Sequence, residues 1–336
     1  MNHARNGAAD APEPLDFERL VYEPLMDRPC KVSLRDMGRP LVPGATLGEW
    51  LESLPPQLGA AALNRLATAI AHAHVSGRPV AGAIGGHVIK TGCGPYLVDW
   101  IDRGVITSLA LNGAAAIHDL ELAIAGKTSE DVGSRLLAGR FGFARETSAL
   151  FVSACERAGE TGEGLGRALG DLVLEHGGPG VGVSVLAAAS RNRMPLTIHV
   201  AVGADIVHMT PDLDGAALGR ATLDDFRLLT QRVAGLAGGV WLNIGSAVIM
   251  PEVFLKAVSI ARNLGRSLEG LTAANLDFDQ KYRGMLNVLE RPGGAGIALT
   301  GHHEILIPLL HAAVAHQLAQ AGPSHPPALA PASASR

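Results

Sequence analysis

Polar side chains follow an apolar run in the stretch LALNGAAAIHDLELAIAG, residues 109–126. The apolar run ends at Asn112-Gly113, and His118 and Asp119 fall at the start of a helical pattern. Small residues let another molecule approach the backbone, and a helix N-terminus offers free N–H groups and a partial positive charge. The stretch therefore predicts a turn that binds an anion such as a phosphate, with His118 as a candidate catalytic residue.

Small and polar residues recur where other apolar runs end. They are Gly203-Ala204-Asp205, Asn243-Ile244-Gly245-Ser246 and Thr300-Gly301-His302-His303. Ligands of parallel sheets bind beyond the carboxyl ends of the strands, so several such ends together favour one ligand site. The alternative is that Gly and Ala only allow tight packing of helix on strand. Neither a GxGxxG nor a GxxxxGK[ST] string occurs, so a standard dinucleotide fingerprint or Walker loop is not supported.

Lysines and carboxylates are the candidates for amine chemistry. A lysine that forms an imine must be neutral at the working pH, which requires desolvation or a neighbouring cation. The chain has five lysines, Lys31, Lys90, Lys127, Lys256 and Lys281. Lys281 and Lys90 are the candidate nucleophiles, and Lys90 is equally suited to bind phosphate or to be solvated. Asp205, Glu252 and Asp277 are candidates to hold a cationic amine, although Glu252 also suits a helix start and Asp277 a turn.

Five histidines lie at or near the ends of apolar runs. They are His118, His199, His208, His302 and His303. Imidazole nitrogens are common metal ligands, so a metal site with Asp205 or Glu304 is one interpretation. The spacing matches neither HExxH nor a compact set of ligands. Hydrogen-bonded structural histidines are therefore the preferred interpretation, and no metal is predicted.

The elements that must position these residues follow a repeated pattern. A short apolar run that ends in small residues is followed by an amphipathic helical pattern in residues 105–126, 240–265 and 296–319. The stretch 196–209 begins in the same way, and 47–76 is helical on both sides of Pro55-Pro56. Alternation of nearly continuous apolar strands with helices predicts an α/β protein with a mostly parallel, doubly wound sheet and helices on both faces.

Composition limits the class of protein. The 336 residues are 47% hydrophobic with a formal net charge of -4, and no long Lys/Arg block is present, so nucleic-acid binding is not expected. Three scattered cysteines fit neither a disulfide framework nor a zinc knuckle. No run of 18 apolar residues and no signal-peptide core occur, which predicts a cytoplasmic protein without a membrane span. We expect a flexible N-terminus over 1–16, one domain over 17–320 with a helical N-terminal portion, and a disordered tail over 321–336.

Several stretches together resemble the deoxyhypusine synthase family. GGHVIKTGCGPYLVDWIDRGVITSLALNGAAAIHDLELA (85–123) resembles the cofactor-binding core of that family, and PLTIHVAVGADIVHM, NIGSAVIMPEVFLKAVSIARNLG and LTAANLDFD follow in the same order. The resemblance covers about residues 80–310. It implies a Rossmann-like fold that binds NAD, a homotetramer, and transfer of an aminobutyl group from spermidine to an amine, either a protein lysine or a small amine such as putrescine.

The resemblance also implies functions for individual residues. It assigns cofactor contacts to His87, Lys90, Asn112, Gly113, Ala114, Asp119, Asp205, Gly245, Ser246, Thr272, Ala273 and Asp277. Asp205 also matches a polyamine contact, and His118-Asp119 replaces an acidic pair of the family. The lysine nucleophile of the family lies in a Trp-Gly-Lys motif, and this chain lacks that motif. The nearest stretch here is DFDQKYRGMLNVLERP (277–292), and Pro251-Glu252 replaces a polyamine-contacting His pair.

Two hypotheses follow from these matches and departures. The first is an NAD-dependent enzyme that transfers an aminobutyl group, with Lys281 or Lys90 in place of the family's lysine. The second is a relative that binds a nucleotide or a polyamine without performing the transfer. The second is motivated by the missing Trp-Gly-Lys motif and by Pro251.

Overall fold

The computed structural model describes residues 13–321. The chain divides into two units, with the boundary between Met37 and Gly38. In the first unit the described residues form two short 3-10 turns, Phe17–Arg19 and Leu34–Asp36, and nearly all of their side chains are exposed. The α/β unit starts at Gly38, and the single domain expected over 17–320 stays a prediction. The expected flexible N-terminus and disordered tail lie almost wholly outside the described residues.

The second unit is built on six parallel strands in the order β3-β2-β1-β4-β5-β6. Every neighbouring pair is parallel. The strands are β1 (Val80–Ile84), β2 (Ser108–Asn112), β3 (Leu196–His199), β4 (Val240–Ile244), β5 (Thr272–Asp277) and β6 (Ala295–Thr300). This order is that of the Rossmann fold, and its switch point lies between β1 and β4. The predicted doubly wound parallel sheet is therefore confirmed.

Helices connect the strands and cover both faces of the sheet. They are α1 (Leu47–Ser53), α2 (Leu58–Val75), α3 (Gly86–Lys90), α4 (Gly94–Asp102), α5 (Gly113–Ala125), α6 (Val132–Leu137), α7 (Arg145–Thr161), α8 (Leu165–His176), α9 (Val185–Arg191), α10 (Gly215–Ala234), α11 (Ile249–Asn263) and α12 (His303–Gln320). Short 3-10 turns span Val181–Val183 and Ile206–Met209, and a π-helical segment, η5, spans Gly284–Glu290. The predicted break at Pro55-Pro56 separates α1 from α2.

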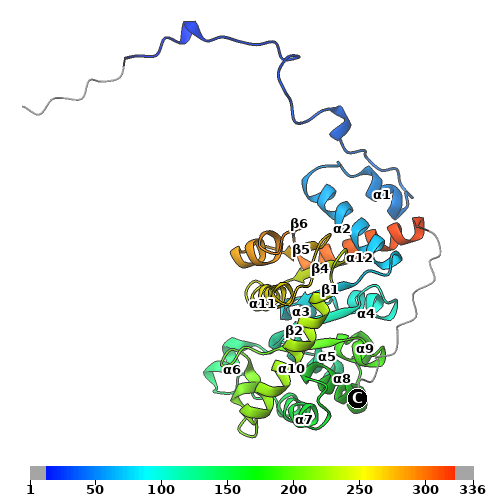
Figure 1. Cartoon of the computed structure of the whole chain (residues 1–336), viewed down its shortest axis with the longest axis vertical. Helices are drawn as coiled ribbons and strands as arrows, with labels where there is room; N and C mark the ends of the chain where they lie inside the picture. The colour runs from blue at the N-terminus through cyan, green and yellow to red at the C-terminus, as the bar shows by residue number, and fades with distance from the viewer. Residues whose placement is uncertain (1–12, 322–336) are drawn as a thin grey trace, which may run out of the picture. The chain divides into compact units, whose positions relative to one another are not determined.

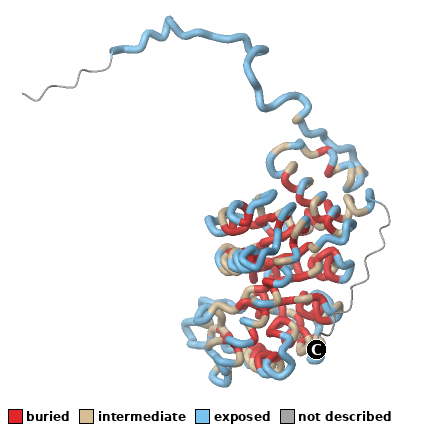
Figure 2. Tube along the Cα trace, in the orientation of Figure 1, coloured by how far each residue is buried: buried red, intermediate tan, exposed pale blue. Residues whose placement is uncertain are grey.

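Alternate side chains of the central strands enter two separate cores. Val80, Leu109 and Leu242 pack with residues of α2, α5, α9 and α12 on one face. Ala81 and Trp241 pack with residues of α10, α11 and η5 on the other. Figure 1 shows α4, α9 and α12 on one side of the strands and α11 on the other, and Figure 2 shows the buried band between them. Strands buried on both faces account for the nearly continuous apolar runs of the sequence.

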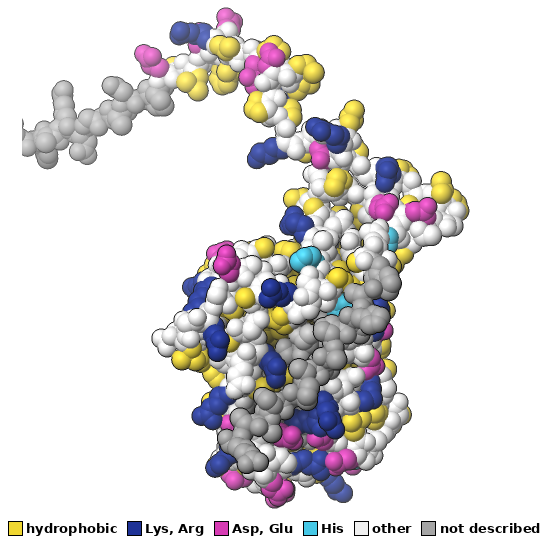
Figure 3. Space-filling view, turned by 45° about the vertical axis from the view of Figure 1, so that its right-hand side comes forward, with side chains coloured by type: hydrophobic (Ala, Val, Ile, Leu, Met, Phe, Trp, Pro, Cys, Tyr) yellow, Lys and Arg dark blue, Asp and Glu magenta, His cyan; other side chains and the backbone are white. Residues whose placement is uncertain are grey.

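Surface charge in the described region is mixed. Figure 3 shows Lys and Arg side chains interspersed with Asp and Glu side chains at one end of the face it draws.

Among residues 13–321, no helix combines the length and the apolar character needed to cross a bilayer. Within the same residues, no cluster of three or more His, Cys, Asp or Glu side chains is arranged to hold a metal ion.

Candidate functional site

The carboxyl ends of the strands form one rim of the sheet. Asn112 ends β2, Asp277 ends β5, and Gly245 follows β4. At the switch point the chains after β1 and β4 continue side by side, because Gly85 donates its N–H to the carbonyl of Ile244 at 3.0 Å. A Cβ atom on Gly85 would lie 2.0 Å from the carbonyl oxygen of Gly245, so the close approach of these two turns requires glycine at residue 85.

The N-terminus of α5 lies against the carboxylate of Asp205. The Asn112 side chain accepts the N–H of Ala115 at 2.9 Å and so caps the helix. A Cβ atom on Gly113 would lie 2.1 Å from Asp205 Oδ2. That same oxygen accepts the N–H of Ala201 at 2.8 Å. Burial raises the pKa of the Asp205 carboxyl above its ordinary value, and the hydrogen bond from Ala201 opposes this shift. Gly113 thus makes room for an acidic group where α5 begins.

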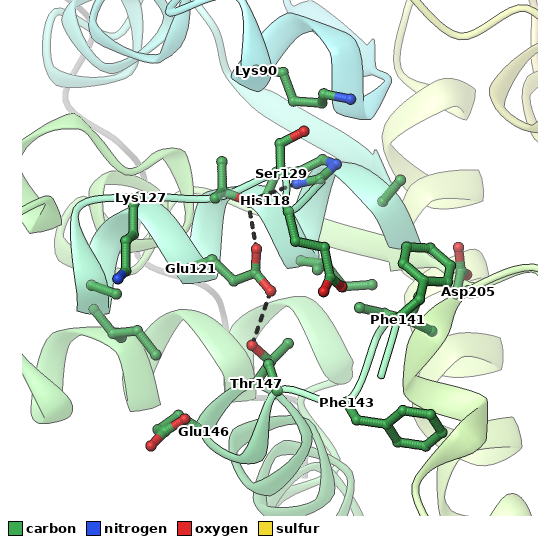
Figure 4. A pocket seen from close by; sticks show the side chains of 18 of the residues that line it. Lys90, His118, Glu121, Lys127, Ser129, Phe141, Phe143, Glu146, Thr147 and Asp205 are labelled. Carbon is green, nitrogen blue, oxygen red and sulfur yellow. Dashed lines mark hydrogen bonds between the residues drawn. The ribbon is translucent and has the colours of Figure 1, made fainter. Parts of the chain in front are cut away.

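A cavity of about 850 Å³ opens beside the first turns of α5. Its walls come from α3, α5, α6, α7 and α8, from the loops that join α5 to α6 and α6 to α7, and from the loop after β3 (Figure 4). The wall includes the predicted residues Lys90, Ala114, His118 and Asp205. In this view Lys90 lies at the top of the cavity, Thr147 and Phe143 lie at the bottom, and Asp205 lies at the right. A volume of this size matches that of small-molecule and cofactor sites.

Hydrogen bonds link His118 to a carboxylate in the cavity wall. His118 Nδ1 lies 2.8 Å from Thr128 Oγ1, and Thr128 donates its hydroxyl proton to Glu121 Oε2 at 2.5 Å. Thr147 donates to the other oxygen of Glu121 at 3.1 Å. Burial, with a smaller contribution from the charge of Lys90, lowers the pKa of His118 to about 4. His118 is therefore neutral at physiological pH.

A second histidine lies buried at the rim. His303 begins α12, and its side chain is 1% exposed. Its Nε2 lies 4.0 Å from Asp277 Oδ1, and its ring centroid lies 5.9 Å from that of His87. Both ring nitrogens of His303 lack a hydrogen-bond partner among the described residues. A Cβ atom on Gly245, whose φ is +63°, would lie 2.7 Å from His303 Nε2. The buried ring therefore has free hydrogen-bonding capacity where β4 and β5 end.

Gly86 lies between the cavity and the buried ring of His303. A Cβ atom on Gly86 would lie 3.0 Å from Ala114 Cβ and 3.1 Å from His118 Cδ2, and the next residue, His87, faces His303. The structure therefore brings several predicted site residues along one stretch of the rim. They are His87, Lys90, Asn112, Gly113, Ala114, His118, Asp205, Gly245 and Asp277.

Thr272 and Ala273 do not belong to this group. Thr272 begins β5 and pairs with Val240, the first residue of β4. Asp277 ends the same strand, so at about 3.3 Å per residue it lies roughly 16 Å from Thr272. Ala273 is fully buried in the core. The resemblance thus assigned cofactor contacts to two residues at the amino edge of the sheet, which a ligand on the carboxyl edge does not reach.

Asp119 and Ser246 serve as helix caps. The Asp119 carboxylate is buried and accepts hydrogen bonds from Ser184 Oγ and from the N–H groups of Val185 and Leu186, at 2.5, 2.9 and 3.0 Å. It thus closes the N-terminus of α9 rather than facing the cavity. Ser246 Oγ accepts the N–H of Met250 at 3.2 Å in the first turn of α11. Both side chains satisfy N–H groups that a helix leaves free.

Lys281 and Glu252 are engaged in ion pairs away from the cavity. Lys281 Nζ pairs with Asp279, and this pairing raises the pKa of Lys281 above its ordinary value. A half-exposed ammonium group held in this way keeps its proton, so the geometry does not suit Lys281 as an imine-forming nucleophile. Glu252 pairs with Lys256 and Arg283 and accepts a hydrogen bond from Asn287. Its carboxylate is therefore occupied by side chains of this chain.

Sequence reasoning missed several residues of the cavity wall. Glu121, Thr128 and Thr147 form the hydrogen bonds around His118, and Phe141 and Phe143 supply aromatic surface. One signal was available, because His118 and Glu121 are three residues apart and so share one face of a helix. Thr128 and Phe141 carry no comparable pattern, since they lie in the two loops on either side of α6, which have no periodicity.

No protein-family model and no curated protein matches this sequence. Solved structures are similar in fold. AgrE in complex with ornithine and NAD+ is 17% identical with a TM-score of 0.51, over 78% of this chain and 33% of AgrE, and unliganded AgrE gives a TM-score of 0.53 over the same shares. A "putative deoxyhypusine synthase" from Entamoeba histolytica is 10% identical with a TM-score of 0.50, over 82% of this chain and 95% of the other. The chain spans about a third of the length of AgrE. These comparisons show a Rossmann-like α/β fold of the kind found in NAD-binding enzymes.

Proposed function

We propose that this chain is an NAD-dependent enzyme that acts on an aliphatic amine. In its finer form, the proposal is transfer of an aminobutyl group from spermidine to an amine acceptor, as the resemblance to deoxyhypusine synthases implies. The observation that carries the proposal is the position of Asp205, whose carboxylate lies against Gly113 between the cavity and the rim of the sheet. A carboxylate in this position suits a cationic amine.

The rim has groups that fit a dinucleotide. His303 has two buried ring nitrogens without partners among the described residues, and the turn at Gly245 has no side chain in front of that ring. An unpaired buried polar group is costly, so a ligand that hydrogen-bonds the ring would stabilise this arrangement. The residues that would hold NAD are His87, Gly245, Asp277 and His303. When bound there, NAD supplies the hydride acceptor for oxidation of the amine.

Known ligands of the similar folds are consistent with an amine. AgrE was solved with ornithine and NAD+, and ornithine shares with the polyamines an aliphatic chain that carries amino groups. A thermal-shift screen with NAD, NADP, spermidine, putrescine and ornithine shows which of these ligands the protein binds. We expect stabilisation by NAD and by at least one of the three amines. The absence of both shifts, with no amine-dependent reduction of NAD, would remove the proposal.

Replacement of Asp205 by asparagine is expected to weaken amine binding. Asparagine keeps the shape of the side chain and the hydrogen bond from Ala201 but removes the charge that meets the ammonium group. A hydrogen bond to a charged group contributes about 1.5–3 kcal/mol, so KM for the amine should rise roughly 10- to 100-fold. Steady-state kinetics and titration calorimetry measure the change. Affinity for NAD should stay the same, and Asp279→Asn, outside the cavity wall, is the matched control.

The two candidate lysines are expected to behave differently. Lys281→Ala should leave amine transfer unchanged, because its ammonium group is half exposed and paired with Asp279. Lys90 lines the cavity, so Lys90→Ala should abolish a covalent enzyme–substrate adduct while amine-dependent reduction of NAD continues. Borohydride reduction followed by peptide mass spectrometry detects such an adduct on lysine. Loss of the adduct in Lys281→Ala would instead place the nucleophile after β5.

The second candidate function is binding of a nucleotide or polyamine without transfer. The pairing of Lys281 with Asp279 favours it, since this lysine occupies the stretch nearest to the missing Trp-Gly-Lys motif. Under this alternative, calorimetry detects NAD and an amine as ligands. Neither an adduct nor reduction of NAD then appears on long incubation.

A further inference from the structure

We infer that Glu121, Thr128 and His118 form a hydrogen-bonded relay that holds His118 in the Nδ1–H tautomer and presents its Nε2 lone pair to the cavity. A ligand group that meets this nitrogen must then be a hydrogen-bond donor, such as the N–H of an amine. The identity of the ligand rests on the proposed function, whereas the tautomer does not. The relay therefore assigns positioning roles to Thr128 and Glu121.

The direction of the hydrogen bonds determines the tautomer. A carboxylate can only accept, and Glu121 takes one hydrogen bond from Thr128 and one from Thr147. A hydroxyl group has one proton, so Thr128 uses its proton on Glu121 and has only lone pairs to offer His118. The 2.8 Å contact between His118 Nδ1 and Thr128 Oγ1 therefore requires a proton on Nδ1. The opposite tautomer would take the Thr128 proton away from Glu121.

His118 is neutral, so its second ring nitrogen carries a lone pair. Desolvation is the largest cause of its lowered pKa, and Lys90 on α3 adds to the effect. His118 Nε2 makes no hydrogen bond to any residue between 13 and 321. It is also not one of the fully buried polar atoms that lack a hydrogen-bond partner. Figure 4 shows His118 between Lys90 and Glu121, with the ring at the wall of the cavity. The free nitrogen is therefore accessible from the cavity.

Other titratable side chains line the cavity wall on several elements. They are Lys127 and Glu130 from the loop after α5, Arg135 from α6, Glu146 from α7, His176 from α8 and Asp205 from the loop after β3. Glu130 is paired with Arg135 at 3.1 Å, which offsets one charge of each sign. Burial is the largest influence on the pKa of His118, and Lys90 adds to it.

The relay limits the class of ligand. An ammonium or amine N–H can donate to Nε2, with a carboxylate such as Asp205 in the same wall to balance a positive charge. An unprotonated phosphate or carboxylate oxygen would place a lone pair against a lone pair at this nitrogen. His118 thus selects for the amine end of a substrate and against an anion, which differs from the phosphate site that the small residues at 112–114 suggest on their own.

The test is a measurement of the protonation of each ring nitrogen in the full chain. Protein labelled with nitrogen-15 in the histidine rings is observed by long-range proton–nitrogen correlation, and His118→Gln assigns the signal. We expect Nδ1 protonated and Nε2 unprotonated, with no titration between about pH 8 and about pH 6. A proton on Nε2, or titration near the ordinary histidine pKa of 6.5, overturns the relay.

Matched threonine variants separate the relay from a general structural effect. Thr128→Val removes the acceptor, so the fixed tautomer should be lost, and Thr128→Ser should restore it. Thr147→Val removes a hydroxyl that binds the same Glu121 without contact to His118, so the tautomer should persist. Persistence of the Nδ1–H tautomer in Thr128→Val contradicts the relay. If this variant does not fold, the wild-type tautomer together with Thr147→Val and Thr128→Ser still decides the question.

Addition of ligand tests the donor assignment separately. Spermidine, putrescine or ornithine should shift the Nε2 signal of His118 as it accepts a hydrogen bond, and sulfate, which has no donor, should not. A shift with sulfate alone overturns the assigned ligand class. No shift with any of the three amines, while the tautomer is as expected, removes the amine and the proposed function but leaves the relay.

Discussion

Asp225→Ala is expected to destabilise the protein by about 3 kcal/mol, because it removes the hydrogen-bond acceptor of two buried backbone N–H groups. Asp225 lies on α10 and is 0% exposed. Its Oδ2 accepts the N–H of Gly166 in α8 at 2.8 Å and that of Ile198 in β3 at 2.7 Å. Alanine would leave both N–H groups without a partner, away from water. Chemical denaturation of the variant and the wild type measures the difference in unfolding free energy.

Asp225→Asn is the matched control and also tests the pH dependence. Burial raises the pKa of Asp225 to about 8, and its Oδ1 has no partner among the described residues, so this oxygen can carry the proton. The folded protein then binds a proton that the unfolded chain releases above about pH 4, so the free energy of unfolding falls as the pH rises from about 4 to about 8. Asparagine mimics the protonated acid and does not ionise in the unfolded chain, so it should match the wild type near pH 4, remove this decline and be the more stable of the two at pH 7. A stability that rises with pH only when Asp225 is present would contradict the account.

Gly113→Ala is expected to lower kcat/KM for the amine by roughly 100-fold, at the upper end of the value of a charge-assisted hydrogen bond. The new Cβ would lie 2.1 Å from Asp205 Oδ2, so the carboxylate must move away from the mouth of the cavity. The side chain of Asp205 can rotate, and alanine is a good helix former, so the fold should survive. Steady-state kinetics, with circular dichroism to verify folding, measures the effect. Gly159→Ala on α7, where a Cβ has no atom within 4 Å, is the control.

The double variant shows whether Asp205 transmits the effect. In an Asp205→Ala background the added methyl group has room, so Gly113→Ala should cost little there, and the two changes should be far from additive. Additive losses would mean that Gly113 acts on the ligand independently of Asp205. In that case Gly113 is small because the cofactor must come close to the backbone there.

Several features of the site came from local sequence patterns. Asn112 ends an apolar run and precedes a helical pattern, and it caps α5 as such a residue should. Strand ends in a parallel sheet share one edge, which explains why Gly113, Asp205, Gly245 and Asp277 were predicted together and lie along one rim. Thr272 lies at the other end of β5, and only one end of a strand reaches that rim.

The sequence by itself determined the alternation of strands and helices, since burial on both faces requires continuous apolar runs and helices require a period of 3.6 residues. Only the tertiary structure decided what each polar side chain does. His118 and Asp119 are adjacent in the chain, yet His118 meets Thr128 in the cavity wall and Asp119 caps α9 some 65 residues away. Adjacent residues on a helix point about 100° apart. Which of those directions is filled by a distant helix, and which by a cavity, depends on how separate elements pack, and no local pattern encodes that packing.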